Sequence, residues 1–168
     1  MMSLTQEEIY TAALQSIITR GYGQLENVKH LISLGAIPNR RCIENGIENG
    51  SVDVLKYLVE EYGYVLEKDN EEFYLIKACK HGYGYTVDYL AKRSSEKTLA
   101  VAVKYTIKQN LPLMILQTLM EIGLERYEGF MDRSEALYFA TIYNHVPMWK
   151  WLQEKGAKPT AAIRNLGR

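Results

Sequence analysis

The 168 residues contain few cysteines and no long apolar run. Cys42 and Cys79 are the only two cysteines, and neither lies in a CxxC pair or beside histidines. This argues against structural zinc and against a disulfide framework. We expect both thiols to be reduced and to pack as small apolar groups. No apolar stretch approaches the ~18 residues that a membrane-spanning helix needs.

The chain also lacks an excess of charge of either sign. Its 20 basic and 20 acidic residues cancel, which removes the long-range field on which nonspecific polyanion binding relies. The first eight residues include Glu7 and Glu8, where a secretory or transit signal would carry positive charge. We therefore expect an intracellular, cytoplasmic protein that binds neither bulk nucleic acid nor membrane.

Motifs that carry catalysis are missing as well. His30, His81 and His145 stand far apart, without an HExxH pattern or a carboxylate at ligand spacing, and fit surface or turn-capping roles better. The motifs GxSxG, GxxxxGK[ST] and GxGxxG are absent. We predict a protein that is not an enzyme and that uses no cofactor and no metal.

What the sequence does contain is a repeated segment. The clearest copy runs from Gly23 to Ala36, and weaker copies follow four more times. Their equivalent apolar positions, separated by 27, 32, 29 and 33 residues, are Val28, Leu55, Val87, Leu116 and Trp149. Such a period is typical of a stacked repeat array.

A second stretch with helical apolar spacing precedes each copy, so each unit is predicted to be two short helices. Thr5 with Glu8, and Asp69 with Glu72, have the form of capping boxes, and Asp132 is a favourable N-cap residue. The predicted fold is all-α, a helix-turn-helix repeat solenoid that forms a single domain over residues 1–168. The predicted repeats cover 5–36, 37–66, 67–94, 95–126 and 132–158, and residues 159–168 form either a cap or a truncated sixth first helix.

Glycine and asparagine mark the predicted turns, because these residues reach left-handed backbone angles at low cost. The turns between the two helices of a unit are expected at Gly21 to Gly23, Asn49-Gly50, Gly82 to Gly84, Asn110 and Asn144. The second helices are expected to end at Gly35, Gly63, Gly123 and Gly156.

The order of these residues resembles the ankyrin repeat, in the divergent form found in large DNA viruses of protists. The first repeat supplies Leu25-Glu26, Val28, Leu31-Ile32 and Gly35-Ala36, the third Ala78-Cys79 and Gly82, and the fifth Ala140-Thr141 and Gly156-Ala157. The resemblance implies a protein-interaction scaffold whose concave face binds a protein partner. For a viral protein it also implies the host cytoplasm.

In that family the two variable residues before the turn line the concave face. Carried over, the partner-binding residues are Thr19, Arg20, Glu48, Asn49, Lys80, His81, Lys108, Gln109, Ile142 and Tyr143. Because the middle of this set is basic and its end apolar, we expect a protein partner that presents an acidic and apolar segment. The alternative is a helical-repeat nucleic-acid reader, which the irregular spacing and zero net charge disfavour. A homo-oligomer is compatible with either.

Aromatic residues are a further source of contact surface, since tyrosine is enriched at interfaces. Among the 13 tyrosines, those expected in turns or loops are candidates for partner contact: Tyr83, Tyr85, Tyr127 and Tyr143. Those at helical spacing are expected to pack between repeats: Tyr57, Tyr89 and Tyr105. Trp149 occupies the expected core position, whereas Trp151 is the expected exposed residue.

Overall fold

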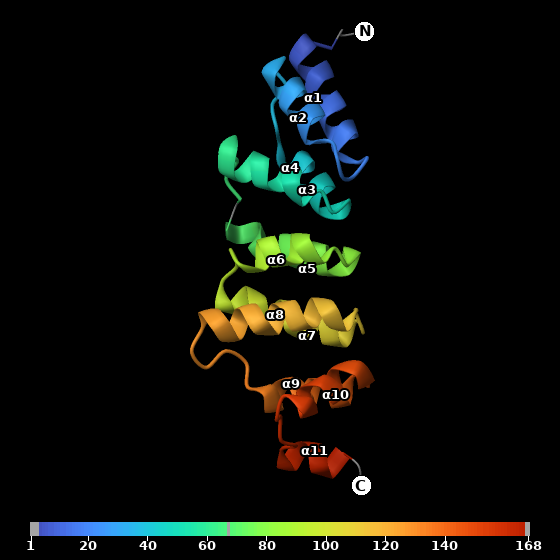
Figure 1. Ribbon diagram of the computed structural model, residues 1–168, viewed down its shortest axis with the longest axis vertical. Helices are drawn as coiled ribbons and strands as arrows, with labels where there is room; N and C mark the ends of the chain where they lie inside the picture. The colour runs from blue at the N-terminus through green and yellow to red at the C-terminus, as the bar shows by residue number, and fades with distance from the viewer. Residues whose placement is uncertain (1–3, 67, 167–168) are drawn as a thin grey trace. The chain divides into compact units, whose positions relative to one another are not determined.

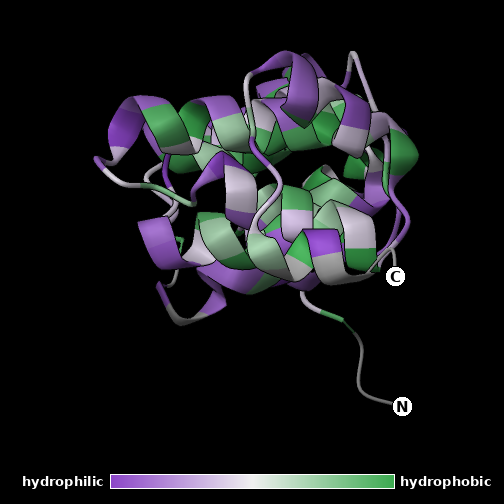
Figure 2. Ribbon diagram, turned by 90° about the horizontal axis from the view of Figure 1, so that it is seen from below, coloured by the Kyte–Doolittle hydropathy of each residue, from purple (hydrophilic) through white to green (hydrophobic). Residues whose placement is uncertain are grey.

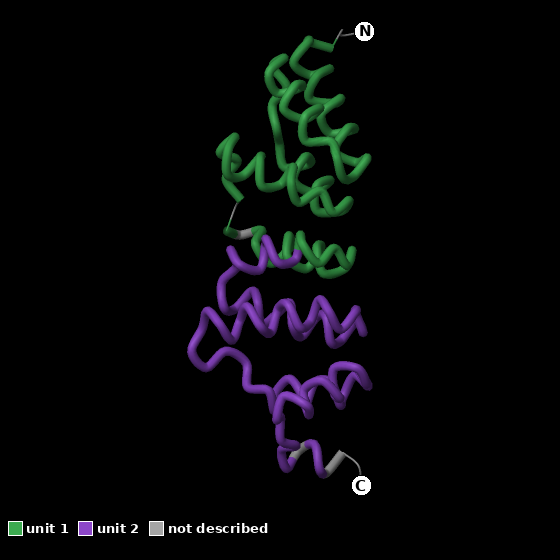
Figure 3. The backbone as a smooth tube through the Cα atoms, viewed as in Figure 1, with its two compact units in different colours: residues 1–86 green, residues 87–168 purple. Residues whose placement is uncertain are grey.

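The computed structural model describes residues 4–66 and 68–166, and every regular element within these ranges is a helix. The predicted all-α class is confirmed. The chain divides into two compact units, Met1–Thr86 and Val87–Arg168, shown in two colours in Figure 3. The boundary falls inside helix α6 (Gly84–Ala91), within the third predicted repeat.

Unit 1 contains two complete helix pairs and the start of a third (Figure 1). Its elements are α1 (Gln6–Ile18), α2 (Leu25–Ser33), α3 (Arg40–Glu48), α4 (Val52–Lys56), a π-helical turn (Tyr57–Glu61), a 3-10 turn (Lys68–Asn70) and α5 (Glu71–His81). Within a pair, α1 contacts α2 and α3 contacts α4. Between pairs, the first helices lie against one another, α1 against α3 and α3 against α5.

Polar side chains cap the N-terminus of the first helix in two of these pairs. Thr5 and Glu8 form the predicted capping box of α1, each satisfying a backbone N–H of the other. Asn39 caps α3 by accepting a hydrogen bond from the N–H of Cys42. A capping box was also predicted from Asp69 and Glu72; a 3-10 turn precedes α5, which begins at Glu71, and the side chain of Asp69 lies outside the described residues.

One extra residue is inserted in the second helix of the second pair. Here α4 passes into the π-helical turn, in which the N–H of Tyr62 bonds the carbonyl of Tyr57 five residues back. The left-handed glycine that ends this helix, Gly63, consequently comes one residue later than Gly35 does after α2. The π turn therefore explains why the second copy of the sequence repeat is offset by one residue.

Unit 2 repeats the same arrangement. Its helices after α6 are α7 (Glu96–Lys108), α8 (Leu113–Arg126), α9 (Arg133–Ile142), α10 (Val146–Glu154) and α11 (Ala161–Leu166). The pairs α7 with α8 and α9 with α10 are in contact, and the first helices again lie side by side, α7 against α9 and α9 against α11. The side chains of Ser95 and Asp132 cap α7 and α9, and the second of these caps was predicted.

The end of α8 departs from the prediction. Helix α8 does not stop at Gly123 but continues to Arg126, and Gly123 is a buried helical residue. The ring of Phe130 folds back onto it, so that a Cβ atom at Gly123 would lie 2.1 Å from ring atom Cε1. Glycine at this position permits a close contact and does not end the helix.

The two tryptophans are also reversed relative to the prediction. Trp151 is buried, with 8% of its surface exposed, whereas Trp149 is only half-buried. Helix α10 places Met148, Trp151 and Leu152 on one face, at the i, i+3 and i+4 spacing of a helix that packs along a single side. Trp149 lies beside that face.

Apolar and polar residues are interspersed along the helices, as the green and purple segments in Figure 2 show. In the part of the chain that the structure describes, no helix is both long and apolar enough to cross a membrane.

Replacing Gly123 with alanine is expected to destabilise the protein. The added methyl group would overlap the Phe130 ring, and overpacking of this kind costs about 1–3 kcal/mol, more than the roughly 1 kcal/mol that alanine gains in a helix. Urea unfolding should show a lower free energy of unfolding for Gly123→Ala. The same substitution in a Phe130→Leu background should cost less, and an equal cost in both backgrounds would contradict the proposed clash.

Candidate interaction surface

The first helices α1, α3, α5, α7 and α9 each end at a residue with a left-handed backbone. Five such residues, with φ between 51° and 83°, are Gly21, Gly50, Gly82, Asn110 and Asn144. All five lie at turns predicted from the sequence. The predicted partner-binding residues are the two positions that immediately precede each of these residues.

In unit 1 this surface is partly engaged by its own helices. Thr19 is exposed, and its hydroxyl donates to the carbonyl of Ser16; the amide of Asn49 donates to the carbonyl of Asn45. Both side chains therefore satisfy carbonyl groups at the ends of their own helices. Arg20, Lys80 and His81 are exposed.

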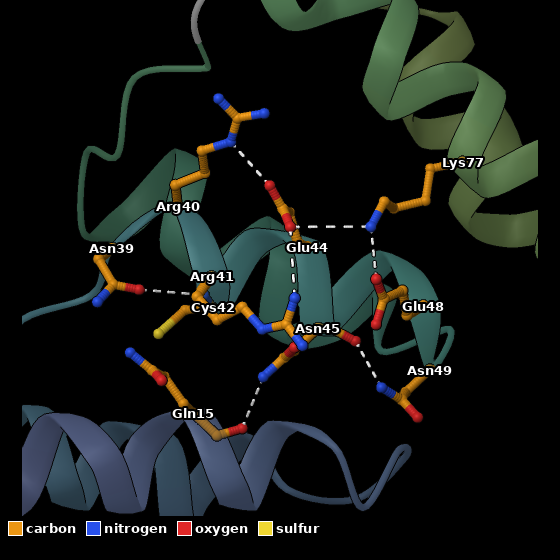
Figure 4. Close-up of polar contacts among 10 residues, drawn as sticks. All are labelled: Gln15, Asn39, Arg40, Arg41, Cys42, Glu44, Asn45, Glu48, Asn49 and Lys77. Atoms are coloured by element: carbon orange, nitrogen blue, oxygen red, sulfur yellow. Dashed lines mark hydrogen bonds and ion pairs between the residues drawn. The ribbon is translucent and has the colours of Figure 1, made fainter.

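Glu48 belongs to a polar network that joins α3 to α5 (Figure 4). Lys77 of α5 lies 2.5 Å from Glu48 and 3.8 Å from Glu44, which also pairs with Arg40 at 2.7 Å. The same lysine lies 5.0 Å from the centre of the Phe73 ring. Glu48 is thus an internal ion-pair partner as well as a surface residue.

The network lowers the pKa of Glu48. The hydrogen bond from Lys77 is the main cause, opposed by desolvation and reinforced by the positive charges of Lys77, Arg41 and His81. A second link, on the other side of α3, is the bond from the Asn45 amide to the Gln15 carbonyl of α1. Polar contacts therefore set the register of α3 against both neighbouring first helices.

In unit 2 the surface is basic and apolar. Lys108 and Gln109 are exposed at the end of α7, and Ile142 and Tyr143, at the end of α9, keep 45% and 40% of their surface exposed. Two further apolar residues stand out near the starts of α8 and α10, Met114 and Val146, exposed by 56% and 48%. They were not among the predicted residues.

Charge is distributed unevenly along these helices. No acidic residue occurs between Glu96 and Glu121 or between Glu135 and Glu154, and these two stretches contain both turns. Lys104, in the middle of α7, is paired with Glu135 at 3.0 Å. The turn end of unit 2 thus contains Lys108 and no carboxylate from these stretches, and Lys150 is exposed in the middle of α10.

A small pocket opens at the second of these turns. It has a volume of about 180 Å³ and is lined by Ala140, Thr141, Asn144, Val146 and Trp149. The neighbouring residue, His145, is buried and caps α10: its Nδ1 atom accepts a hydrogen bond from the N–H of Met148, and its Nε2 atom lies 3.0 Å from the carbonyl oxygen of Leu111. Surface or turn-capping roles were predicted for the histidines, and His145 has the second of these.

The tyrosines fall into two groups. Tyr85 and Tyr143 are exposed, but the hydroxyl of Tyr127 donates to the Ser94 carbonyl, and Tyr83 packs against Gly50. Tyr127 and Tyr83 are therefore structural contacts and not free candidates. Tyr89 is buried, as expected for a packing residue.

The structure places the predicted residues at equivalent turns within each unit, but sequence reasoning missed the exposed Met114 and Val146, the ion-pair network around Glu48, and the pocket. Lys77 and Glu44 were missed because an ion pair between residues about thirty positions apart leaves no local pattern. The pocket was missed because Trp149 was expected in the core. Among the described residues, no three histidine, cysteine or acidic side chains gather where they could hold a metal ion.

No protein-family model, curated protein or solved structure matches the chain.

Removing the amine of Lys77 is expected to raise the Glu48 pKa. Since the folded pKa lies below the ordinary value of 4.5, the carboxylate stabilises the fold fully above pH 4.5, and this contribution is lost as the pH falls through the folded pKa. In Lys77→Met, an NMR titration of the Glu48 carboxyl should return toward 4.5, and unfolding at pH 7 should cost about 0.5–1 kcal/mol less free energy.

The matched control is Lys80→Met, which removes an exposed lysine from the same helix. It should leave the Glu48 titration almost unchanged. If Lys77→Met and Lys80→Met shift the Glu48 pKa equally, the network does not control this carboxylate.

Proposed function

We propose that this chain is a non-enzymatic protein-interaction scaffold, a helix-pair repeat solenoid of the ankyrin type. It binds a protein partner through the turn ends of its first helices. In this proposal, side-by-side packing of the helix pairs supplies stability, and the variable residues before each turn supply specificity.

The observation that carries the proposal is the same turn in both units. In unit 1 and in unit 2, first helices lie against one another and end at a left-handed residue. The i to i−5 hydrogen bond that closes the turn also recurs, from Ser51 to Gly46, from Leu111 to Thr106 and from His145 to Ala140. A constant backbone that presents different side chains is the arrangement repeat proteins use for recognition.

The exposed side chains at these turns favour a partner segment that is acidic and apolar. Lys80 in unit 1 and Lys108 in unit 2 supply positive charge, and Ile142 and Tyr143 supply apolar contact surface. Charged residues at such a surface steer the encounter and exclude like-charged partners, while buried aromatic and aliphatic groups supply most of the affinity.

Charge reversal at the two lysines tests the proposal. A partner is first captured from a lysate with the immobilised full chain, identified by mass spectrometry and purified. Calorimetric titration should then show that Lys80→Glu/Lys108→Glu weakens binding about tenfold or more, because like charges face each other across the interface.

The control is Lys56→Glu/Lys97→Glu, which makes the same charge change at exposed lysines away from the turns. It should bind as the wild type does. Equal weakening by both double variants would place the contact elsewhere. Salt-sensitive retention of RNA by the wild type, lost in the turn variant, would favour the nucleic-acid reader instead.

A further inference from the structure

The turn at Asn144 matches the turn at Gly50 residue by residue. In both turns, the N–H of the residue after the left-handed residue donates a hydrogen bond to the carbonyl five residues back. The N–H of the next residue donates to the carbonyl of the left-handed residue, from Val52 to Gly50 and from Val146 to Asn144. The N–H of Leu55 bonds Ser51, and that of Trp149 bonds His145. The offset is therefore 94 residues throughout, and the pocket lining corresponds to Gly46, Ile47, Gly50, Val52 and Leu55.

In unit 1 the corresponding position is covered by an aromatic ring. Tyr83, which directly follows the left-handed Gly82, packs so closely that a Cβ atom at Gly50 would lie 2.6 Å from its ring. Gly50 and Leu55 are both buried. In unit 2, His145 follows the left-handed Asn144 and reaches back in the same way to the turn at Leu111.

At Asn144 a pocket takes the place of such a ring. Asn144 and Val146 are exposed, and Trp149 is half-buried where its counterpart Leu55 is fully buried. Helix α11 packs against α9, as α9 packs against α7, but none of the described lining residues comes from α11. Among the described residues, none covers this pocket as Tyr83 covers Gly50.

The chemistry of the pocket fits a tyrosine. Its volume of about 180 Å³ exceeds the roughly 150 Å³ cavity that accommodates a benzene ring. Trp149 offers an aromatic surface for stacking. The Thr141 hydroxyl donates to the Leu137 carbonyl and keeps its lone pairs to accept a hydrogen bond from a phenol.

The charges near the pocket indicate which residues should flank that tyrosine in the partner. Lys150 follows Trp149, Lys108 ends the neighbouring helix α7, and the stretch from Ala136 to Gln153 contains no carboxylate. We propose that the pocket at Asn144 binds a tyrosine side chain of a partner protein, flanked by acidic residues. Because Asn144 carries the Cβ atom that Gly50 lacks, the ring lies in the pocket against Trp149 and not directly on the turn backbone, where Tyr83 lies in unit 1. This rests on the proposed function and names the anchor of its partner.

Peptide titration of the full chain tests the pocket. The probes are blocked peptides Ser-Glu-Glu-Tyr-Glu-Ser and its versions with leucine or alanine in place of tyrosine. The readout is the indole N–H signal of Trp149 in ¹⁵N NMR spectra, assigned by its loss in Trp149→Phe. The tyrosine peptide should shift this signal saturably with a Kd of about 1 mM or below, and the leucine and alanine peptides should bind at least about fivefold more weakly.

Filling the pocket should abolish this response. Thr141→Phe places a ring in the pocket and should reduce binding at least about tenfold, whereas Thr118→Phe should not, although its hydroxyl likewise bonds a carbonyl four residues back. Equal shifts with the alanine peptide, or wild-type binding by Thr141→Phe, would overturn the assignment. A concentration-dependent dimer that Thr141→Phe abolishes would also overturn it, because the occupant would then be a second copy.

The outcomes separate the pocket from the scaffold. If a captured partner depends on Lys108 but no tyrosine peptide shifts Trp149, the pocket inference fails and the scaffold stands. If the tyrosine peptide binds and no partner depends on the turn lysines, the pocket stands and the proposed scaffold surface fails.

Discussion

The packing of one first helix against the next is the contact on which the rest of each unit depends. Helix α3 buries Cys42, Ile43 and Ile47, and it contacts both α1 and α5. A pair of short amphipathic helices cannot bury its apolar stripe alone, so each pair relies on its neighbour to exclude water. The polar links from Asn45 to Gln15 and from Glu48 to Lys77 then fix how these helices slide along one another.

This contact also restricts which residues can vary. If the helix sides are used for packing, the residues left to vary are those at the turns, and there the backbone is held by a left-handed residue and a repeated hydrogen bond. The turn can therefore change its side chains without changing its path. An aromatic side chain that follows one turn and covers the turn before it, as Tyr83 does, is part of the same packing.

Local sequence patterns were sufficient for much of the fold. The all-α class, the capping box at Thr5 and the left-handed turns at Asn110 and Asn144 could be predicted because each depends on neighbouring residues. Gly123 was misassigned because a glycine that ends a helix and one that admits a ring look alike in sequence, and the ring of Phe130 decides between them.

The candidate site was less predictable, since it depends on contacts between distant residues. The positions before the turns follow from the repeat, but the pairing of Glu48 with Lys77 does not. Trp149 and Trp151 show the same limit. Their spacing predicts that the two side chains point in different directions, but only the packing of α10 determines which of them is buried. The spacing of the repeat can be read from the sequence, whereas the burial of each side chain depends on how the helices pack.

Hydrogen exchange in unit 1 tests most directly whether packing between first helices carries stability, because α1 and α3 differ in length, in capping and in the number of neighbouring first helices. Helix α1 has 13 residues and a complete capping box and, among the described helices, lies against one first helix, α3. Helix α3 has 9 residues and lies against two, α1 and α5. If packing between first helices carries stability, the most protected amides of α3 should have protection factors at least about tenfold above those of α1. Equal or greater protection in α1 would contradict the account, because helix length and capping would then outweigh the neighbours.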